Sequence, residues 1–124
     1  AAVKVRTMVT GHGMSPNTGN AGEFYALWRR IEVGERQWYD LLWKTDVYLN
    51  PVRPQGGTWK FSRAGWAPGS IAEAWTVDIT SAVKIGSPVT VGYGLEPFVN
   101  KTPNEGFLAA HVIGSQAILF EKAK

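Results

Sequence analysis

Two charged side chains at the ends of loops are the best candidates for chemistry in this sequence. Arg63 lies in a loop punctuated by Gly65, Pro68 and Gly69, and Glu23 opens a strand-like run after a loop rich in Gly, Ser, Pro and Asn. At such junctions a scaffold can hold a side chain out toward a ligand. A carboxylate can then hold a water or act as acid or base, and a guanidinium can make forked contacts to oxygen atoms.

Each of these two residues also has an ordinary alternative. Glu23 could be a solvated glutamate at a strand start, because most surface carboxylates face water. Arg63 could hydrogen-bond loop carbonyls. Residue type and spacing leave both alternatives open.

Aromatic residues are the next candidates, because a flat ring can stack on a ligand. The chain has six Trp residues, and a large share of them must lie in the core. Trp28, Trp43 and Trp75 fall within expected strands and are predicted to be core residues. Trp59 and Trp66 lie near loops, and Trp66 shares the Arg63 loop, so it is a candidate for ligand binding.

The small number of histidines and the absence of cysteine limit the metal sites that this chain could form. With only His12, His111 and no Cys, neither a thiolate site nor a multi-histidine site is expected, and no metal or cofactor is predicted. His12 lies between two glycines of the loop at 11–22, where a lone histidine usually does nothing specific. His111 lies in an expected strand and is predicted to be packed or paired.

Composition predicts one ordinary globular domain over residues 1–124. The hydrophobic share is 44%, the charged share is 19%, and the net charge of +3 comes from scattered basic residues. We therefore expect no nucleic-acid partner. No apolar run approaches the roughly 20 residues that span a bilayer, so no membrane partner is expected. Since the sequence begins at Ala1, we expect a mature form or a cut-out domain.

Strand-like runs separated by turn signals set the expected fold class. Alternation is clear around Val3, Val5, Thr7 and Val9, and no long helical period is present. This pattern predicts an antiparallel β-sandwich or barrel. The expected strand regions are 3–9, 24–33, 38–49, 59–61, 75–79, 87–95, 106–113 and 116–122, the last two joined as a hairpin at 114–115. In the middle of 38–49 a helix is the alternative, and composition favours the strand.

Four short stretches carry a resemblance to a known family. Taken in chain order they are Arg6-Thr7 through Gly11-His12-Gly13, Gly22-Glu23-Phe24, Arg63-Ala64-Gly65-Trp66-Ala67-Pro68-Gly69 and Asn104-Glu105-Gly106-Phe107. The sequence resembles the C-terminal domain of the peptide:N-glycosidase F family, over nearly its whole length. The Arg-Ala-Gly-Trp-x-Pro-Gly run is its most specific part. The resemblance implies an all-β, eight-stranded antiparallel jelly-roll β-sandwich.

The resemblance also implies roles for individual residues. Glu23 and Arg63 fall on catalytic positions of the family, and Trp66 and His12 on substrate-binding ones, with His12 replacing a tryptophan that lines the cleft. The implied ligand is an N-glycan or glycopeptide, and the implied location is secreted or periplasmic. Cysteines of the family are replaced by Ala21, Tyr25 and Ala67, so packing and hydrogen bonds must hold these loops.

The largest departure from the family is an absent aspartate. In the family the principal catalytic aspartate comes from a second, upstream jelly roll, and no aspartate here matches it. We therefore expect the C-terminal half of an N-glycan-releasing amidase that is inactive alone. A non-catalytic glycan-binding module and a structural or assembly domain are the alternatives.

The expected geometry follows from this reading. A two-sheet fold should bring Glu23 and Arg63 together on a shared, solvent-open surface. If the two residues lay on opposite sides of the molecule, or if either were tied up in an internal ion pair, the carbohydrate-processing hypothesis would fall and only the architecture would remain.

Overall fold

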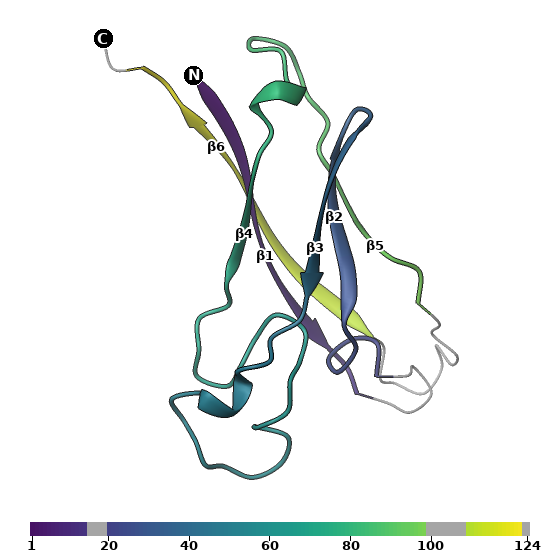
Figure 1. Ribbon diagram of the computed structural model, residues 1–124, viewed down its shortest axis with the longest axis vertical. Helices are drawn as coiled ribbons and strands as arrows, with labels where there is room; N and C mark the ends of the chain where they lie inside the picture. Colours follow the sequence, from purple (N-terminus) through teal and green to yellow (C-terminus); the bar gives the residue numbers. More distant parts are fainter. Residues whose placement is uncertain (15–19, 99–108, 123–124) are drawn as a thin grey trace.

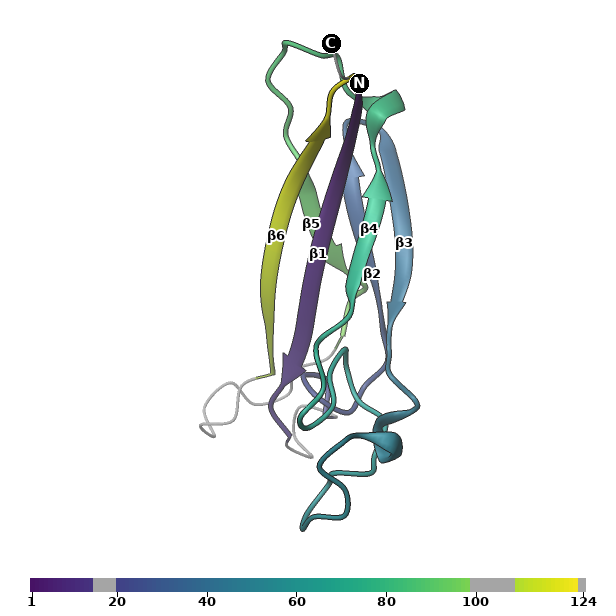
Figure 2. The same ribbon diagram turned by 90° about the vertical axis from the view of Figure 1, so that its left-hand side faces the viewer.

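Two antiparallel sheets of three strands each form the part of the protein that the structure describes. A computed structural model describes residues 1–14, 20–98 and 109–122. Within these residues one sheet has the order β4-β1-β6 and the other the order β3-β2-β5 (Figures 1 and 2). The strands are β1 (Ala2–His12), β2 (Leu27–Val33), β3 (Arg36–Leu42), β4 (Ala74–Asp78), β5 (Gly92–Leu95) and β6 (Ala110–Phe120), with short 3-10 helices η2 (Val47–Leu49) and η3 (Thr80–Ala82).

β1 is the central strand of its sheet, and the alternation along it determines which of its faces is buried. Val5, Thr7 and Val9 are buried, while Arg6 and Met8 between them are exposed. This period of two places one face of the strand on the core. β1 pairs with β4 on one side and, from Ala2 to His12, with β6 on the other.

The second sheet is built on the β2–β3 hairpin, which turns at residues 34–35. Gly34 has a φ of +58°, a conformation that glycine adopts without steric cost. Leu27, Arg29, Ile31 and Val33 are the buried positions of β2. Three of these are apolar, so Arg29 is a charged residue in a row of core positions.

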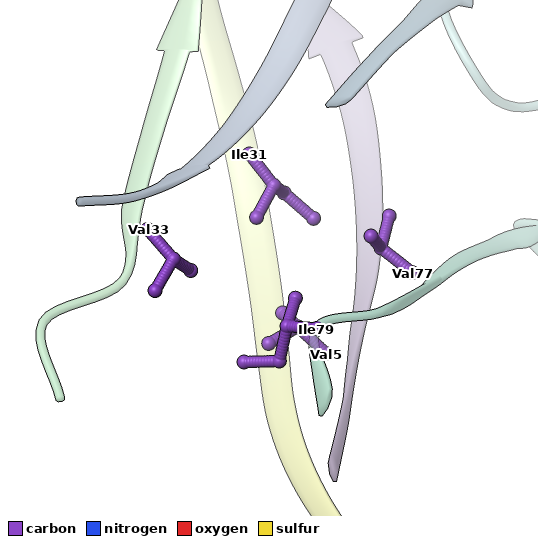
Figure 3. Close-up of a cluster of buried hydrophobic side chains, with 5 residues drawn as sticks. All are labelled: Val5, Ile31, Val33, Val77 and Ile79. Atoms are coloured by element: carbon purple, nitrogen blue, oxygen red, sulfur yellow. The ribbon is translucent and has the colours of Figure 1, made fainter. Parts of the chain in front are cut away.

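The main core cluster lies between the two sheets. Val5 and Val77 from one sheet meet Ile31 and Val33 from the other, and Ile79 completes the cluster (Figure 3). Burying each such side chain contributes about 1.5–3 kcal/mol. This apolar contact is what holds the two sheets face to face.

The prediction of an all-β, antiparallel sandwich is confirmed, and the predicted number of strands is not. The described residues contain six strands, so the eight strands and the jelly-roll order are not confirmed. The hairpin predicted at 114–115 is wrong. Gly114 and Ser115 lie inside β6, opposite Met8 and Thr7, because β6 pairs with β1 over its whole length.

Two other strand predictions are wrong in the segment between β3 and β4. Residues 43–49 leave the sheet and end in η2, and residues 59–61 form turns. The buried Asn50 side chain holds this segment, because its Nδ2 donates to the carbonyls of Val47 at 2.8 Å and Trp59 at 3.2 Å. The segment lies at the end of the sandwich opposite both termini (Figures 1 and 2).

The burial predicted for the tryptophans is wrong for Trp28. Trp28 was predicted to be core, but its side chain is half exposed because the inward position beside it belongs to Arg29. Trp43, Trp59, Trp66 and Trp75 are intermediate in burial. The stretch Asn104-Glu105-Gly106-Phe107 lies outside the described residues.

Two features are absent from the described residues. No helix there is long and apolar enough to cross a membrane. No group of three acidic or histidine side chains there is arranged to hold a metal ion.

Candidate functional site

Backbone hydrogen bonds join three loop segments at the end of the sandwich opposite the termini. The amide of Ala64 donates to the carbonyl of Glu23 at 2.9 Å, and the amide of Gly11 donates to the carbonyl of Ala64 at 2.9 Å. The amide of Glu23 in turn donates to the carbonyl of Gly13 at 3.2 Å. The loops beside Ala21 and Ala67 are thus held by hydrogen bonds and packing, as expected for a chain without cysteine.

Two glycines allow this close approach. A Cβ atom on Gly22 would lie 1.7 Å from the carbonyl oxygen of His12, which no side chain could tolerate. Gly65 has a φ of +75°, and a Cβ there would lie 2.2 Å from the carbonyl oxygen of Val9. Both positions therefore require glycine to bring the Glu23 and Arg63 loops against β1.

Glu23 and Arg63 form an ion pair at the centre of this arrangement. Nη1 of Arg63 donates to Oε1 of Glu23 at 3.0 Å. The Arg63 side chain is only 2% exposed and that of Glu23 is 17% exposed. The predicted meeting of the two residues is confirmed. The prediction that both share a solvent-open surface is wrong for Arg63, whose side chain is tied up in an internal ion pair. The condition set against carbohydrate processing is therefore met at Arg63, and any such role rests on the partly exposed Glu23 alone.

The remaining donors of Arg63 are occupied by its own loop. Nε donates to the carbonyl of Phe61 at 3.3 Å, and Nη2 donates to the carbonyl and the hydroxyl of Thr58. The structure therefore shows the ordinary alternative for Arg63, which binds loop carbonyls, together with an internal ion pair to the Glu23 carboxylate. It cannot reach a ligand in this conformation, and its direct effect is to hold Glu23.

Aromatic rings surround the Arg63 guanidinium. Its Cζ lies 4.6 Å from the ring centroid of Trp66 and 5.1 Å from that of Phe24. Such cation–π contacts contribute about 0.5–2 kcal/mol each, more when water is excluded. Phe24 was not singled out from the sequence, although it belongs to the Gly22-Glu23-Phe24 stretch.

His12 extends the stack of rings. Its ring lies 5.5 Å from that of Trp66 with an interplanar angle of 29°. Nε2 of His12 is 2.8 Å from the hydroxyl oxygen of Thr10, and Nε1 of Trp66 donates to the carbonyl of Gly11 at 2.9 Å. The structure therefore places all four predicted site residues in one cluster, Glu23, Arg63, Trp66 and His12.

The electrostatics of the cluster favour an ionised pair. Burial lowers the pKa of the Arg63 guanidinium below its ordinary value, while the Glu23 carboxylate acts in the opposite direction and raises that pKa. An arginine stays protonated in proteins, so the pair keeps both charges. Among the described residues, the hydrogen bond to Glu23 is made to Oε1 alone.

The family described as Peptide-N-glycosidase F, C terminal, matches residues 1–116 of the chain. The chain belongs to this family. The resemblance predicted from Glu23 and the Arg63 loop is thereby confirmed. No curated protein matches the chain.

Solved structures agree with the Peptide-N-glycosidase F fold. One is described as the structure of PNGase F, a glycosylasparaginase from Flavobacterium meningosepticum, with a TM-score of 0.72. Another, recombinant peptide:N-glycanase F (PNGase F), has a TM-score of 0.73. Both are 23% identical to this chain and match 94% of it. The chain spans only 38% of either solved protein, so the similarity concerns the fold of one part of them.

Proposed function

We propose that this chain is the C-terminal half of an amidase that releases N-glycans from asparagine. The observation that carries the proposal is the Glu23 carboxylate, held through Oε1 by the buried Arg63 within a member of the Peptide-N-glycosidase F family. A carboxylate fixed in this way needs no reorganisation to hold a water or a substrate hydroxyl. Arg63 is then a positioning residue and not a group that contacts the substrate.

One carboxylate supplies only part of the chemistry. Hydrolysis of the amide between glycan and asparagine needs a base that activates water and a donor that stabilises the charge on the amide oxygen. We propose that an upstream jelly-roll domain supplies the missing aspartate, and that this chain alone is inactive. The solved proteins support this, since they extend well beyond the part that this chain matches.

The substrate proposed for the site is an N-linked glycopeptide. Trp66 and His12 provide stacked rings beside Glu23, and an aromatic face with a few fixed polar groups suits a sugar ring. The secreted or periplasmic location stays a prediction.

A mass-spectrometric assay tests the proposal on the longer protein that carries this chain. Hydrolysis converts the glycosylated asparagine to aspartate and releases the glycan. We expect Glu23→Gln to slow release by about 10²–10⁴-fold, the usual range for a lost acid–base group. Glu35→Gln, the same change at an exposed turn residue, is the control. Equal rates for both variants would reject the role of Glu23.

A non-catalytic glycan-binding module is the second candidate. The observation that favours it is the burial of Arg63, which leaves Glu23 as the single charged group of the cluster with an exposed surface. A binding module would bind a glycopeptide without hydrolysis even in the longer protein. The same assay therefore separates the two functions.

A further inference from the structure

A hollow lies beside the Arg63 loop and shares no side chain with the Glu23 cluster. Its volume is about 220 Å³, and the lining residues that matter are Arg29, Asp40, Trp43, Lys44, Gly65 and Glu73. Lys44 and Arg63 exchange two backbone hydrogen bonds, at 2.9 and 3.1 Å, so the hollow is tied to the loop that positions Glu23. None of Glu23, Trp66 and His12 lines it.

The charges around the hollow balance. Arg29 pairs with Asp40, with 2.6 Å between Nη2 and Oδ2, and Lys44 pairs with Glu73, with 2.8 Å between Nζ and Oε1. Hydrogen bonds to Asp46 and Glu73 raise the pKa of the Lys44 ammonium group, so it stays charged. Two cations and two anions line the hollow, and therefore neither a free anion nor a free cation gains a net attraction there.

Arg29 holds one wall of the hollow. The residue is 6% exposed, and both Nε and Nη2 donate to Oδ2 of Asp40. Its Nη1 is buried and has no hydrogen-bond partner among the described residues. Because this nitrogen is closed to solvent, Arg29 fixes the Asp40 carboxylate, and Lys44 is the cation of the hollow that can donate to a ligand.

The lining chemistry selects one class of ligand. A sugar ring carries hydroxyls that accept from Lys44 and donate to Asp40 and Glu73, while its C–H face can pack on Trp43. The volume lies below the range of about 300–1,000 Å³ typical of drug-sized ligands, which limits the occupant to a single ring. We propose that this hollow is a second carbohydrate subsite, which binds one neutral sugar ring apart from the Glu23 cluster.

This subsite deepens the proposed function and rests on it for the source of the sugar, a further ring of the same glycan. Titration of the ¹⁵N-labelled 124-residue chain with N-acetylglucosamine and with methyl α-mannoside tests it. At least one sugar should shift the Trp43 indole and the Lys44 and Gly65 amides in a saturable way. No saturable shift at these groups, or saturation there by inorganic phosphate instead, overturns the subsite.

A matched pair of variants locates the binding. Glu73→Gln removes one acceptor charge from a side chain that is 81% exposed, so the fold tolerates it. It should weaken sugar binding at Trp43 about tenfold, the effect of one charge-assisted hydrogen bond. Glu35→Gln, remote from the hollow, should leave it unchanged. Equal binding by both variants contradicts the subsite.

The titration also separates this subsite from the proposed function. Shifts at Trp66 without shifts at Trp43 reject the subsite and leave the Glu23 proposal standing. Shifts at Trp43 without any at Trp66 support the subsite and count against the Glu23 cluster as a sugar site. Shifts at both that persist at Trp43 in Glu23→Gln support the two as independent sites.

Discussion

Nη1 of Arg63 lies 3.0 Å from Oε1 of Glu23, although the two residues are 40 positions apart in sequence. The pair is asymmetric, because Arg63 is buried and Glu23 keeps an exposed edge. Its partners at Thr58 and Phe61 fix the guanidinium, and the guanidinium fixes the carboxylate. Glu23 is therefore a preorganised group at the surface, and Arg63 is its internal support.

Loss of Arg63 should destabilise the fold. Arg63→Ala leaves Glu23 and several loop carbonyls without their donor, and removal of one partner from a buried pair costs about 3–5 kcal/mol. We expect a value near the lower limit, since Glu23 can be rehydrated. Urea denaturation followed by tryptophan fluorescence measures it. Arg36→Ala, at an exposed site, should change the free energy of unfolding by less than about 0.5 kcal/mol, and a similar loss in both variants would contradict the structural role of Arg63.

Arg29 and Asp40 allow a second stability test. Asp40→Asn leaves the guanidinium of Arg29 uncompensated at a position where its side chain is 7% exposed. Because Asp40 is 37% exposed, we expect a cost of about 2 kcal/mol, below the full penalty of a buried pair. Asp46→Asn is the matched control, with a much smaller effect, since Asp46 is largely exposed. If thermal unfolding showed a larger loss of stability for Asp46→Asn than for Asp40→Asn, the stabilising role of the Arg29–Asp40 ion pair would be refuted.

Gly65 should tolerate no side chain. Gly65→Ala adds a Cβ at a φ of +75° that also meets the carbonyl oxygen of Val9, so we expect a loss above about 2 kcal/mol. Gly86→Ala is the control, because its φ of +82° is similar but the added Cβ meets no atom within 4 Å. Its cost should be about 1 kcal/mol. Equal melting temperatures for the two variants would argue against the close approach of the Arg63 loop to β1.

His111 predicts a dependence of stability on pH. Burial lowers the pKa of His111 below its ordinary value of 6.5, so the unfolded chain binds this proton more readily than the folded chain. Stability from the neutral imidazole is fully present above pH 6.5 and is lost as the pH falls through the lowered pKa. His111→Leu should flatten the plot of unfolding free energy against pH in this window. Parallel plots for the wild type and the variant would contradict the prediction.

The local pattern predicted much of the fold because alternation is a local property. Val5, Thr7 and Val9 face the core as the period of two requires, and Leu27 and Ile31 do the same in β2. The hairpin at 114–115 failed because Gly and Ser signal a turn only in the absence of a partner strand. There, β1 supplies that partner, which local sequence cannot reveal.

The proximity of the four candidate residues was predictable, and their exposure was not. The resemblance grouped Glu23, Arg63, Trp66 and His12, which do lie together. Burial of Arg63 depends on carbonyls of residues 58 and 61, in a segment expected to be partly a strand. The Arg29–Asp40 pair was also missed, although these residues lie opposite each other across the β2–β3 hairpin. The expected strands 24–33 and 38–49 left residues 34–37 as the turn. The turn instead occupies residues 34–35 alone, and this shorter turn sets the register.

The central claim is that Glu23, held by Arg63, is the carboxylate that meets a glycan. Its most direct test is a titration of the ¹⁵N-labelled chain with a chitobiosyl-asparagine peptide, with the same peptide lacking the sugar as control. We expect saturable shifts for the amides of residues 22–24 and the Trp66 indole in the wild type, and their loss in a folded Glu23→Gln variant. Shifts of equal size in the variant, or none in the wild type at the highest soluble concentration, would contradict the claim.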